Sequence, residues 1–243
     1  MAIEALLASY PRTRPPLTAA HEAVFAEQYK LNREGGSVAD GAAQKLEQWM
    51  HRKVAARGGG PVLELGAGTL NHLPFEAGDA PYDIVEPFHA LFTGKPGFAR
   101  LRAHYDSVQD VPEGTLYARI VSIAVLEHLT DLPRDVARSA LLLEEDGIFQ
   151  AGIPSEGGFL WWLGWRGATG LGYYLRTRLD YGVVMRHEHV NKAREIEALV
   201  NYLFDEVSVR RFPTPFHQLS FYAYLEARRP RRDRAERLLA AGA

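Results

Sequence analysis

Two glycines and one carboxylate stand at the spacing of a nucleotide-binding site. The apolar run PVLEL (61–65) is followed at once by Gly66 and Gly68. Glycine at both positions lets the chain turn tightly and lets a ligand lie where any Cβ would collide. The next apolar run ends at Glu86, 20 residues after Gly66. This is the sequence spacing at which a carboxylate at the end of the second strand accepts hydrogen bonds from ribose hydroxyls. This pattern predicts a site for a nucleotide-like cofactor.

Several other chemistries lack the residues that they require. A dinucleotide-binding loop has a third glycine at the position of Asn71. None of the 11 tyrosines has a lysine four residues later, the catalytic spacing of short-chain dehydrogenases, so a nicotinamide oxidoreductase is disfavoured. Neither GxSxG nor GxxxxGK[ST] occurs, which argues against a serine hydrolase and a P-loop enzyme.

Four motifs resemble those of the class I S-adenosylmethionine-dependent methyltransferases. They are VLELGAGT (62–69), Glu86 after the second run, SIAVLEHL (122–129) and LLLEEDGIFQAGIP (141–154), and the likeness covers roughly residues 60–154. The resemblance implies S-adenosylmethionine as cofactor. Within the superfamily, ELGAGTLNHLPF, IPSEGG and EHVN resemble bacterial enzymes of surface-polysaccharide or secondary-metabolite pathways.

The resemblance also implies positions for the parts of the cofactor. The methionine part would lie near the first loop, with the ribose on Glu86. The adenine would meet Asp106, Ser107 and Phe88. The residues carried over are Glu64, Gly66, Ala67, Gly68, Glu86, Phe88, Asp106, Ser107, Ala124 and Val125. The chain departs from the family at Leu70, where a third glycine is usual.

Histidines supply the candidate catalytic groups. Methyl transfer is an in-line displacement, so a base is needed only where the acceptor must lose a proton, as a hydroxyl does. The candidates are His128 at the tip of the fourth strand and His189, the first choice, in RHEHVN. His187 and His189 could share one face of an extended segment, but no third ligand is evident and HExxH is missing. We therefore expect no metal site.

An aromatic and cationic segment is the expected acceptor cap. Residues 155–190 lie between the fifth strand and the next helix, where related enzymes build acceptor pockets, and their glycines would let them move as a lid. Aromatic walls with arginines suit a sugar, a planar metabolite, a phosphorylated head group or a lipid-linked glycan. The candidate acceptor-binding residues are Trp161, Trp162, Trp165, Arg166, Tyr173, Tyr181 and His187. A dimer contact or additional core is the alternative interpretation of this segment.

Buried strands and amphipathic helices must position these residues. The expected strands are 61–65, 82–86, one before Asp106, 118–125, 147–153, 206–212 and 219–227, separated by helices that include 132–143 and 192–204, the latter capped by Asn191. This predicts an α/β fold with a doubly wound, seven-stranded and mostly parallel sheet, as in Rossmann-like methyltransferases.

The domain organisation follows from the same patterns. Residues 59–228 form the expected cofactor-binding catalytic domain. A helical segment (1–58) precedes it, with an irregular lead-in (1–18), one helix from Ala19 to Lys30 that Gly35-Gly36 ends, and another from Ser37. A basic tail (229–243) follows it.

Composition limits the partners and the compartment. The 243 residues include no cysteine, which removes disulfides and thiolate chemistry. A net charge of −2 gives no overall field for nucleic acid, and the most apolar window, 159–165, is too short for a bilayer span. No export signal is visible, so we expect a cytoplasmic protein. The basic tail could touch an anionic membrane surface, and a homodimer is possible.

Two functions are compatible with these residues. The first is methyl transfer from S-adenosylmethionine to a small-molecule or glycan-type acceptor, with oxygen slightly favoured over nitrogen. The second is a non-catalytic scaffold or binding subunit that keeps the fold, and Leu70 is its only support.

Overall fold

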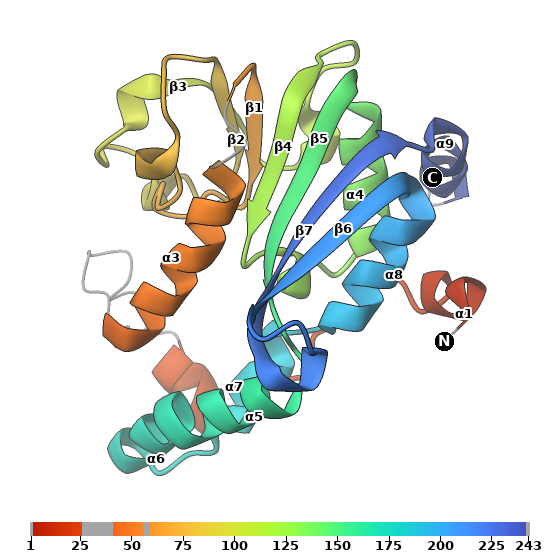
Figure 1. Ribbon diagram of the computed structural model, residues 1–243. Coiled ribbons are helices and arrows are strands. Elements are labelled where there is room, and N and C mark those ends of the chain that lie inside the picture. The colour runs from red at the N-terminus through yellow and green to blue at the C-terminus, as the bar shows by residue number, and fades with distance from the viewer. Residues whose placement is uncertain (1, 26–40, 56–58, 242–243) are drawn as a thin grey trace.

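A seven-stranded sheet organises the computed structural model, which describes residues 2–25, 41–55 and 59–241 (Figure 1). The strand order is β3-β2-β1-β4-β5-β7-β6, and β7 alone runs antiparallel to its neighbours. The strands are β1 Val62–Leu65, β2 Tyr82–Val85, β3 Leu101–Tyr105, β4 Tyr117–Ile123, β5 Leu143–Pro154, β6 Phe204–Pro213 and β7 Ser220–Pro230. The predicted α/β class and mostly parallel seven-stranded sheet are confirmed.

Helices cover both faces of this sheet and create two apolar cores. On one face lie α4 (Leu132–Leu141), α8 (Ala193–Leu203) and α9 (Arg232–Ala241), and on the other lies α3 (Gly41–Ala55). Side chains of β1 alternate accordingly, because Leu63 and Leu65 enter the first core and Val62 enters the second. Helix α3 packs so closely on β5 that a Cβ at Gly152 would lie 2.7 Å from Met50.

The first half of the sheet lacks the α-helices that a doubly wound fold predicts between its strands. The connections carry only the 3₁₀ turns η1 Leu73–Phe75, η2 His89–Leu91, η3 Phe98–Arg100 and η4 Val108–Asp110. Proline and glycine interrupt each connection, at Pro74 and Gly78, at Pro87 and Gly97, and at Pro112 and Gly114. Because proline removes an N–H and glycine favours bends, none of these segments sustains an α-helix.

The N-terminal residues are more ordered than the expected lead-in. Helix α1 (Ile3–Leu7) buries Leu6 near α8, and residues 19–25 are helical as predicted. The predicted helix end at Gly35-Gly36 and the helix start at Ser37 lie outside the described residues.

The expected cap is a helical arm that projects from the lower end of the sheet in Figure 1. It consists of α5 (Phe159–Gly164), a π-helix η6 (Trp165–Gly170) and α6 (Leu171–Thr177), and α7 (Tyr181–Glu188) returns toward the sheet. The glycines at 164, 167, 170 and 172, expected to loosen a lid, lie inside these helices. Across the described ranges, no helix combines the length and hydropathy that a bilayer crossing requires.

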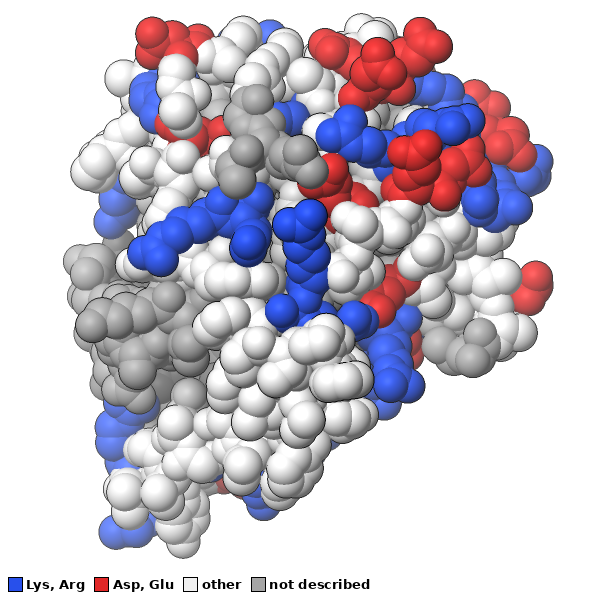
Figure 2. All heavy atoms as spheres, viewed as in Figure 1, with Lys and Arg blue, Asp and Glu red and all other residues white. Residues whose placement is uncertain are grey.

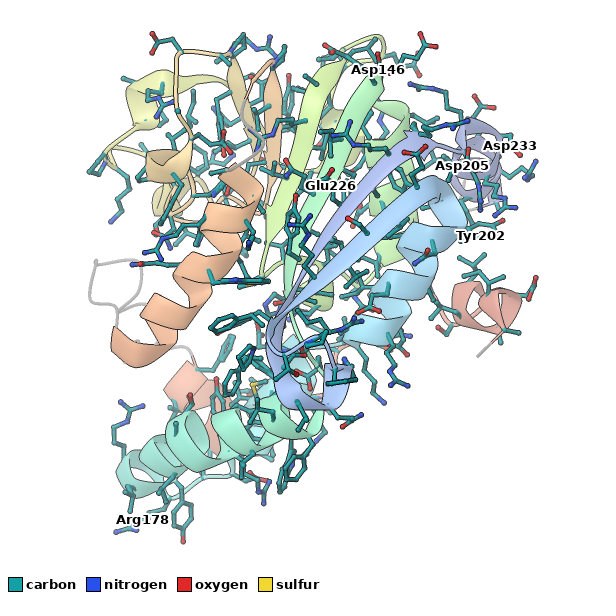
Figure 3. All side chains as sticks on the ribbon, viewed as in Figure 1. Asp146, Arg178, Tyr202, Asp205, Glu226 and Asp233 are labelled. Carbon is teal, nitrogen blue, oxygen red and sulfur yellow. The ribbon has the colours of Figure 1, made fainter. Side chains whose placement is uncertain are left out.

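The basic C-terminal segment packs against the body. Helix α9 buries Ala235 beside α4, and Figure 3 shows Tyr202 and Asp205 close to it. Arg231 donates to Asp205, and Arg232 and Arg234 donate to backbone carbonyls. These arginines hold the end of the chain in place, which limits what they offer to another surface.

Candidate functional site

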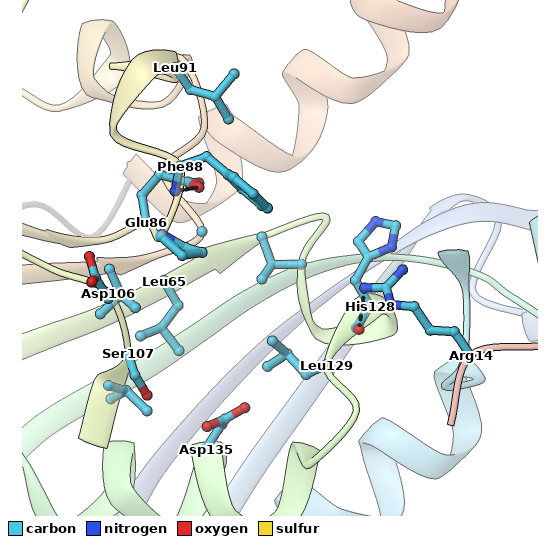
Figure 4. A pocket seen from close by; sticks show the side chains of 15 residues that line it. Arg14, Leu65, Glu86, Phe88, Leu91, Asp106, Ser107, His128, Leu129 and Asp135 are labelled. Carbon is cyan, nitrogen blue, oxygen red and sulfur yellow. Dashed lines mark hydrogen bonds between the residues drawn. The ribbon is translucent and has the colours of Figure 1, made fainter. Parts of the chain in front are cut away.

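A cavity of about 430 Å³ opens at the carboxyl ends of β1, β2 and β4 (Figure 4). Parallel sheets bind ligands at this edge, where the strand order reverses. The volume lies within the usual range for small-molecule pockets. Among the residues predicted for the cofactor, six line it: Gly66, Glu86, Phe88, Asp106, Ser107 and Val125.

The loop after β1 depends on left-handed backbone conformations. Gly66 has φ +67°, and a Cβ there would lie 2.4 Å from Val125, two residues after the end of β4. Glycine at this position therefore satisfies both the turn and the close approach of the two strands. Leu70 also has φ +65° and is buried, so a residue with a Cβ takes a left-handed conformation at the position where the family resemblance implies a glycine.

Glu86 fixes this loop from the end of β2. Its carboxylate accepts the N–H of Gly68 at 2.9 Å and the N–H of Phe88 at 3.0 Å, and it is buried at the cavity wall. A carboxylate has about four acceptor sites, so two such bonds leave capacity for ribose hydroxyls. The predicted carboxylate and the glycine loop thus meet directly.

The far end of the cavity provides groups suited to a heteroaromatic ring. Asp106 and Ser107 follow β3, and Asp106 accepts from His89 Nε2 at 2.7 Å. Phe88 lies at the mouth with 55% of its surface exposed, and Leu91 and Val108 add apolar walls. An amino-bearing ring would find both a stacking face and a carboxylate here.

Four residues predicted for the cofactor do not line the cavity: Glu64, Ala67, Gly68 and Ala124. Glu64 faces the α3 side of the sheet, where it accepts from the hydroxyl of Tyr82 at 2.9 Å, and burial raises the pKa of this carboxyl. Gly68 turns its N–H toward Glu86. These residues support the loop from the side that faces away from the cavity.

Two charged residues of the cavity wall were missed by sequence reasoning. Arg14 reaches the site from the N-terminal segment and donates to the carbonyl of His128 and the carboxylate of Glu188. Asp135 projects from the first turn of α4, and burial raises its pKa to about 6. No local motif marks either residue, since both arrive through long-range packing.

Of the two candidate catalytic histidines, His128 lines the cavity and His189 packs against His128 from outside the lining. Their rings meet edge to face with centroids 4.9 Å apart. His128 Nδ1 contacts the carbonyl oxygen of Glu188 at 2.9 Å, and His189 Nδ1 contacts Glu156 Oε2 at 2.9 Å. A carbonyl or carboxylate oxygen accepts only, so each Nδ1 donates its N–H, and Nε2 is the ring nitrogen that can offer a lone pair.

The predicted acceptor residues divide into two groups, one close to His189 in space or sequence and one in the helical arm. Trp161 donates its indole N–H to Glu156 and lies beside His189, with ring centroids 6.3 Å apart. His187 contacts the carbonyl of Pro15 instead. Away from the cofactor cavity, Trp165, Arg166 and Tyr181 line a second hollow of about 460 Å³ in the arm. Tyr173 is buried against Tyr181, and Trp162 is largely exposed.

Comparisons with known proteins identify the fold. No protein-family model and no curated protein matches this sequence. A SAM-dependent methyltransferase from Thermotoga maritima, described as a possible histamine N-methyltransferase, aligns over 86% of this chain and 96% of its own with a TM-score of 0.54 and 13% identity. The chain has the class I methyltransferase fold.

Two Burkholderia thailandensis structures have the same methyltransferase fold. The 1,6-didemethyltoxoflavin-N1-methyltransferase, solved with that compound and S-adenosylhomocysteine, aligns over 88% of this chain and 92% of its own with a TM-score of 0.55 and 18% identity. An O-methyltransferase family protein aligns over 93% of this chain and 68% of its own with a TM-score of 0.56 and 16% identity. At these identities the likeness establishes the fold alone.

Proposed function

We propose that this protein transfers the methyl group of S-adenosylmethionine to a small-molecule acceptor. The observation that carries the proposal is the cavity at the carboxyl edge of the sheet, where Gly66 and Glu86 stand together beside Asp106. The glycine gives a ligand close access to the backbone, and the two carboxylates match the ribose hydroxyls and the adenine amino group. The toxoflavin-precursor enzyme with the same fold was solved with S-adenosylhomocysteine, which supports this choice of cofactor.

Each part of the cofactor has proposed contacts in this chain. Glu86 binds the ribose, Asp106 and Ser107 bind the adenine, and Phe88 packs on its face. Gly66 and Val125 lie against the methionine part, with Glu64, Ala67, Gly68 and Ala124 supporting them from behind. The bound cofactor supplies an electrophilic methyl carbon, so the protein's task is to align the acceptor and keep the site dry.

The acceptor is proposed to enter beside the two catalytic histidines. The lone pairs on Nε2 of His128 and His189 are positioned to accept a proton from a hydroxyl, which favours oxygen over nitrogen. Trp161 and His187 lie on this side, and residues 155–190 form the acceptor cap. Aromatic side chains with nearby arginines suit a glycan-type or planar acceptor.

Calorimetric titration tests the cofactor assignment. S-adenosylmethionine and S-adenosylhomocysteine should bind with micromolar dissociation constants, and NADH should not bind. Glu86→Gln removes one of the acceptors that the ribose requires, so both adenosyl ligands should bind about tenfold more weakly, the effect of losing about 1.4 kcal/mol.

The matched control is Glu145→Gln, which changes an exposed carboxylate near the opposite end of β5 and should leave binding unchanged. Absence of adenosyl binding to the folded wild-type protein would overturn the proposal and favour a scaffold role.

A further inference from the structure

Three side chains that could ligate a metal converge beside the cofactor cavity. Glu127 and His128 lie in η5 (Leu126–His128), and His189 follows α7, some 60 residues later. One ligand atom from each residue lies within 4.8 Å of the other two. The N–H groups of Val190 and Asn191 both donate to the carbonyl of Glu127, so backbone hydrogen bonds hold the two segments in register.

Both histidines are oriented as metal ligands are. A ligating imidazole typically donates its second ring N–H to a carbonyl or a carboxylate, which fixes the ring and increases its basicity. His128 makes this bond to the carbonyl of Glu188, and His189 makes it to the carboxylate of Glu156. Trp161 donates to the same oxygen of Glu156 at 2.6 Å, so the partner of His189 is itself held in place.

Glu127 contributes negative charge where water is scarce. Its side chain is 2% exposed, and Oε1 lies 3.8 Å from His128 Nε2. A carboxylate buried between two imidazoles gains more from a cation than an exposed one, because the interior screens charge poorly. Two imidazoles and one carboxylate form the ligand set of several zinc and non-haem iron enzymes.

We propose that Glu127, His128 and His189 bind a divalent transition-metal ion such as Zn²⁺ or Mn²⁺. Bonds of about 2.0–2.1 Å to tetrahedral zinc require ligand atoms roughly 3.3 Å apart, so the three side chains close on the ion by small movements. His128 also lines the cofactor cavity, and this places the open coordination positions on the side where the acceptor is expected.

This site deepens the proposed function and rests on it for its role. With an ion bound, the two imidazoles would ligate the metal in place of accepting a proton. An acceptor hydroxyl would coordinate through its oxygen, the ion would lower its pKa, and its proton would pass to solvent before the oxygen receives the methyl group. The structure therefore favours an acceptor that ligates through oxygen, such as a vicinal diol or a hydroxy acid.

Metal binding is tested without any adenosyl ligand. Protein stripped with a chelator is titrated with Zn²⁺ by calorimetry and with Co²⁺ by visible absorption, which reports the coordination geometry. We expect one ion per chain. Glu127→Gln and His189→Ala should weaken binding at least tenfold, and Glu156→Gln, which keeps all three ligands, should weaken it about 10–100-fold.

The matched control is His187→Ala, two residues from His189 but bonded to Pro15, which should bind metal as the wild type does. Equal affinity in the ligand variants, or no binding by folded wild-type protein, would overturn the metal site. S-adenosylhomocysteine binding is measured on the same preparations, so failure of the metal site and failure of the proposed cofactor are read separately.

A second inference rests on the outer surface of the helical arm. Exposed apolar side chains gather here, and Figure 2 shows a broad uncharged surface over the arm at the lower end of the molecule. Eight of the eleven large apolar residues that are exposed in the described structure belong to the arm or to the adjoining β6–β7 connection: Phe159, Trp162, Leu163, Leu171, Tyr174, Leu175, Phe216 and Leu219. Apolar patches of this kind mark interaction surfaces.

Charge indicates what this surface binds. Residues 157–179 contain Arg166, Arg176 and Arg178 but no acidic residue, and Figure 3 shows Arg178 at the outer end of the arm. Aromatic and aliphatic side chains beside arginines are typical of helices that lie in the interface of an anionic bilayer. We infer that the arm docks on an anionic lipid surface.

Vesicle sedimentation tests the docking surface. The protein should pellet with phosphatidylcholine vesicles containing phosphatidylglycerol and remain in solution with phosphatidylcholine alone. Leu175→Asp and Arg176→Glu should each reduce pelleting severalfold, whereas Phe98→Asp, an exposed apolar residue on η3, should not. Light scattering that shows a dimer lost in Leu175→Asp, without lipid binding by the wild type, would overturn the inference and assign the face to a second copy.

Discussion

At the scale of single residues, Leu70 shows how a residue with a Cβ is held in a left-handed backbone conformation. A left-handed conformation costs a residue with a Cβ about 1 kcal/mol or more. Burial offsets this cost, since Leu70 is 2% exposed and packs in the core between α3 and the sheet. Burying a leucine contributes about 1.5–3 kcal/mol, so packing outweighs strain.

This balance predicts that glycine is tolerated better than alanine at position 70, which reverses the usual order of the two substitutions. Leu70→Ala and Leu70→Gly should both lower the free energy of unfolding by about 2–5 kcal/mol. Glycine tolerates φ +65° and alanine does not, so Leu70→Gly should be the more stable of the two by about 1 kcal/mol. Urea unfolding measures the difference. At Leu73, buried in η1 without a positive φ, alanine should be the more stable; the same order at both sites would contradict the strain argument.

Asp135 gives a second prediction at this scale. Burial raises its pKa to about 6, with Asp131 adding to the increase and Gln109 opposing it. Between pH 3.8 and 6 the folded protein keeps a proton that the unfolded chain releases, so this residue stabilises the fold less as pH rises. Asp135→Asn should therefore be more stable than the wild type at pH 8, by up to about 3 kcal/mol, and the gap should close near pH 4.

Chemical denaturation across this pH range measures the effect of Asp135→Asn. The control is Asp146→Asn, at an exposed position near the start of β5, and it should change stability equally at every pH. A constant difference for Asp135→Asn as well would show that this carboxyl is not desolvated.

At the scale of elements, a network of buried polar side chains lies between α3 and the sheet. His51 on α3 contacts His72, whose other ring nitrogen contacts Glu76 at 2.8 Å, and Arg119 on β4 donates two hydrogen bonds to Glu76. Gln150 on β5 accepts from Arg119 at 2.9 Å. All five side chains are buried, so their polar groups depend on one another for partners, and the network fixes α3 against β4 and β5.

Acid should weaken the packing of α3 on β4 and β5. Burial, reinforced by His72, lowers the pKa of His51 to about 4. Between pH 6.5 and 4 the unfolded chain binds a proton that folded His51 rejects, so stability is complete above pH 6.5 and falls by about 3 kcal/mol as pH drops through this window. Burial would raise the pKa of Glu76, but hydrogen bonds from His72 and Arg119 outweigh it and lower the pKa to about 2, which extends the loss below pH 4.5.

His51→Phe tests this origin of acid sensitivity. Phenylalanine keeps the stacking on Phe75, at 5.0 Å in the wild type, and cannot take up a proton. At pH 7 the variant should be less stable by about 1 kcal/mol because it loses one hydrogen bond, and its stability should fall less between pH 6.5 and 4. Parallel stability curves for the two proteins would place the acid sensitivity elsewhere.

Regular elements and the cofactor loop could be predicted from sequence because their signals are local. Each buried strand is a short apolar run, and α4 and α8 carry clear helical periodicity, so their positions are confirmed to within a few residues. The loop glycines and Glu86 meet as predicted, since the carboxyl ends of adjacent parallel strands share one edge.

Long-range contacts account for what sequence reasoning missed. Asn191, predicted to cap α8, is fully buried, donates to the carbonyls of Leu126 and Leu129, and accepts from the hydroxyl of Tyr10; Lys192 occupies the cap position instead. Glu127, the third residue of the proposed metal site, was also missed, because it lies 62 residues before His189 in the chain. Neither partnership follows from periodicity or spacing.

At the scale of the whole molecule, the N-terminal strap (residues 9–15) connects the cofactor edge to the cap. Arg12 binds the carboxylate of Glu195 through both terminal nitrogens, at 2.8 and 3.1 Å, and also donates to the carbonyl of Val190. Arg14 holds Glu188 and forms part of the cavity wall. The strap therefore joins the start of the chain to the segment that carries His189, and its position should respond to a ligand in the cavity.

Hydrogen exchange measures that response. S-adenosylhomocysteine should slow amide exchange at residues 85–88, on the cavity wall, and also at residues 9–14, because a ligand that contacts Arg14 favours the docked strap. Arg14→Ala should abolish the slowing in the strap and keep it at 85–88. Arg52→Ala, an exposed arginine on α3, should preserve both. If the ligand slows exchange at 85–88 in the wild type but leaves the strap unchanged, the strap only anchors the N-terminus, and the cavity wall is complete without it.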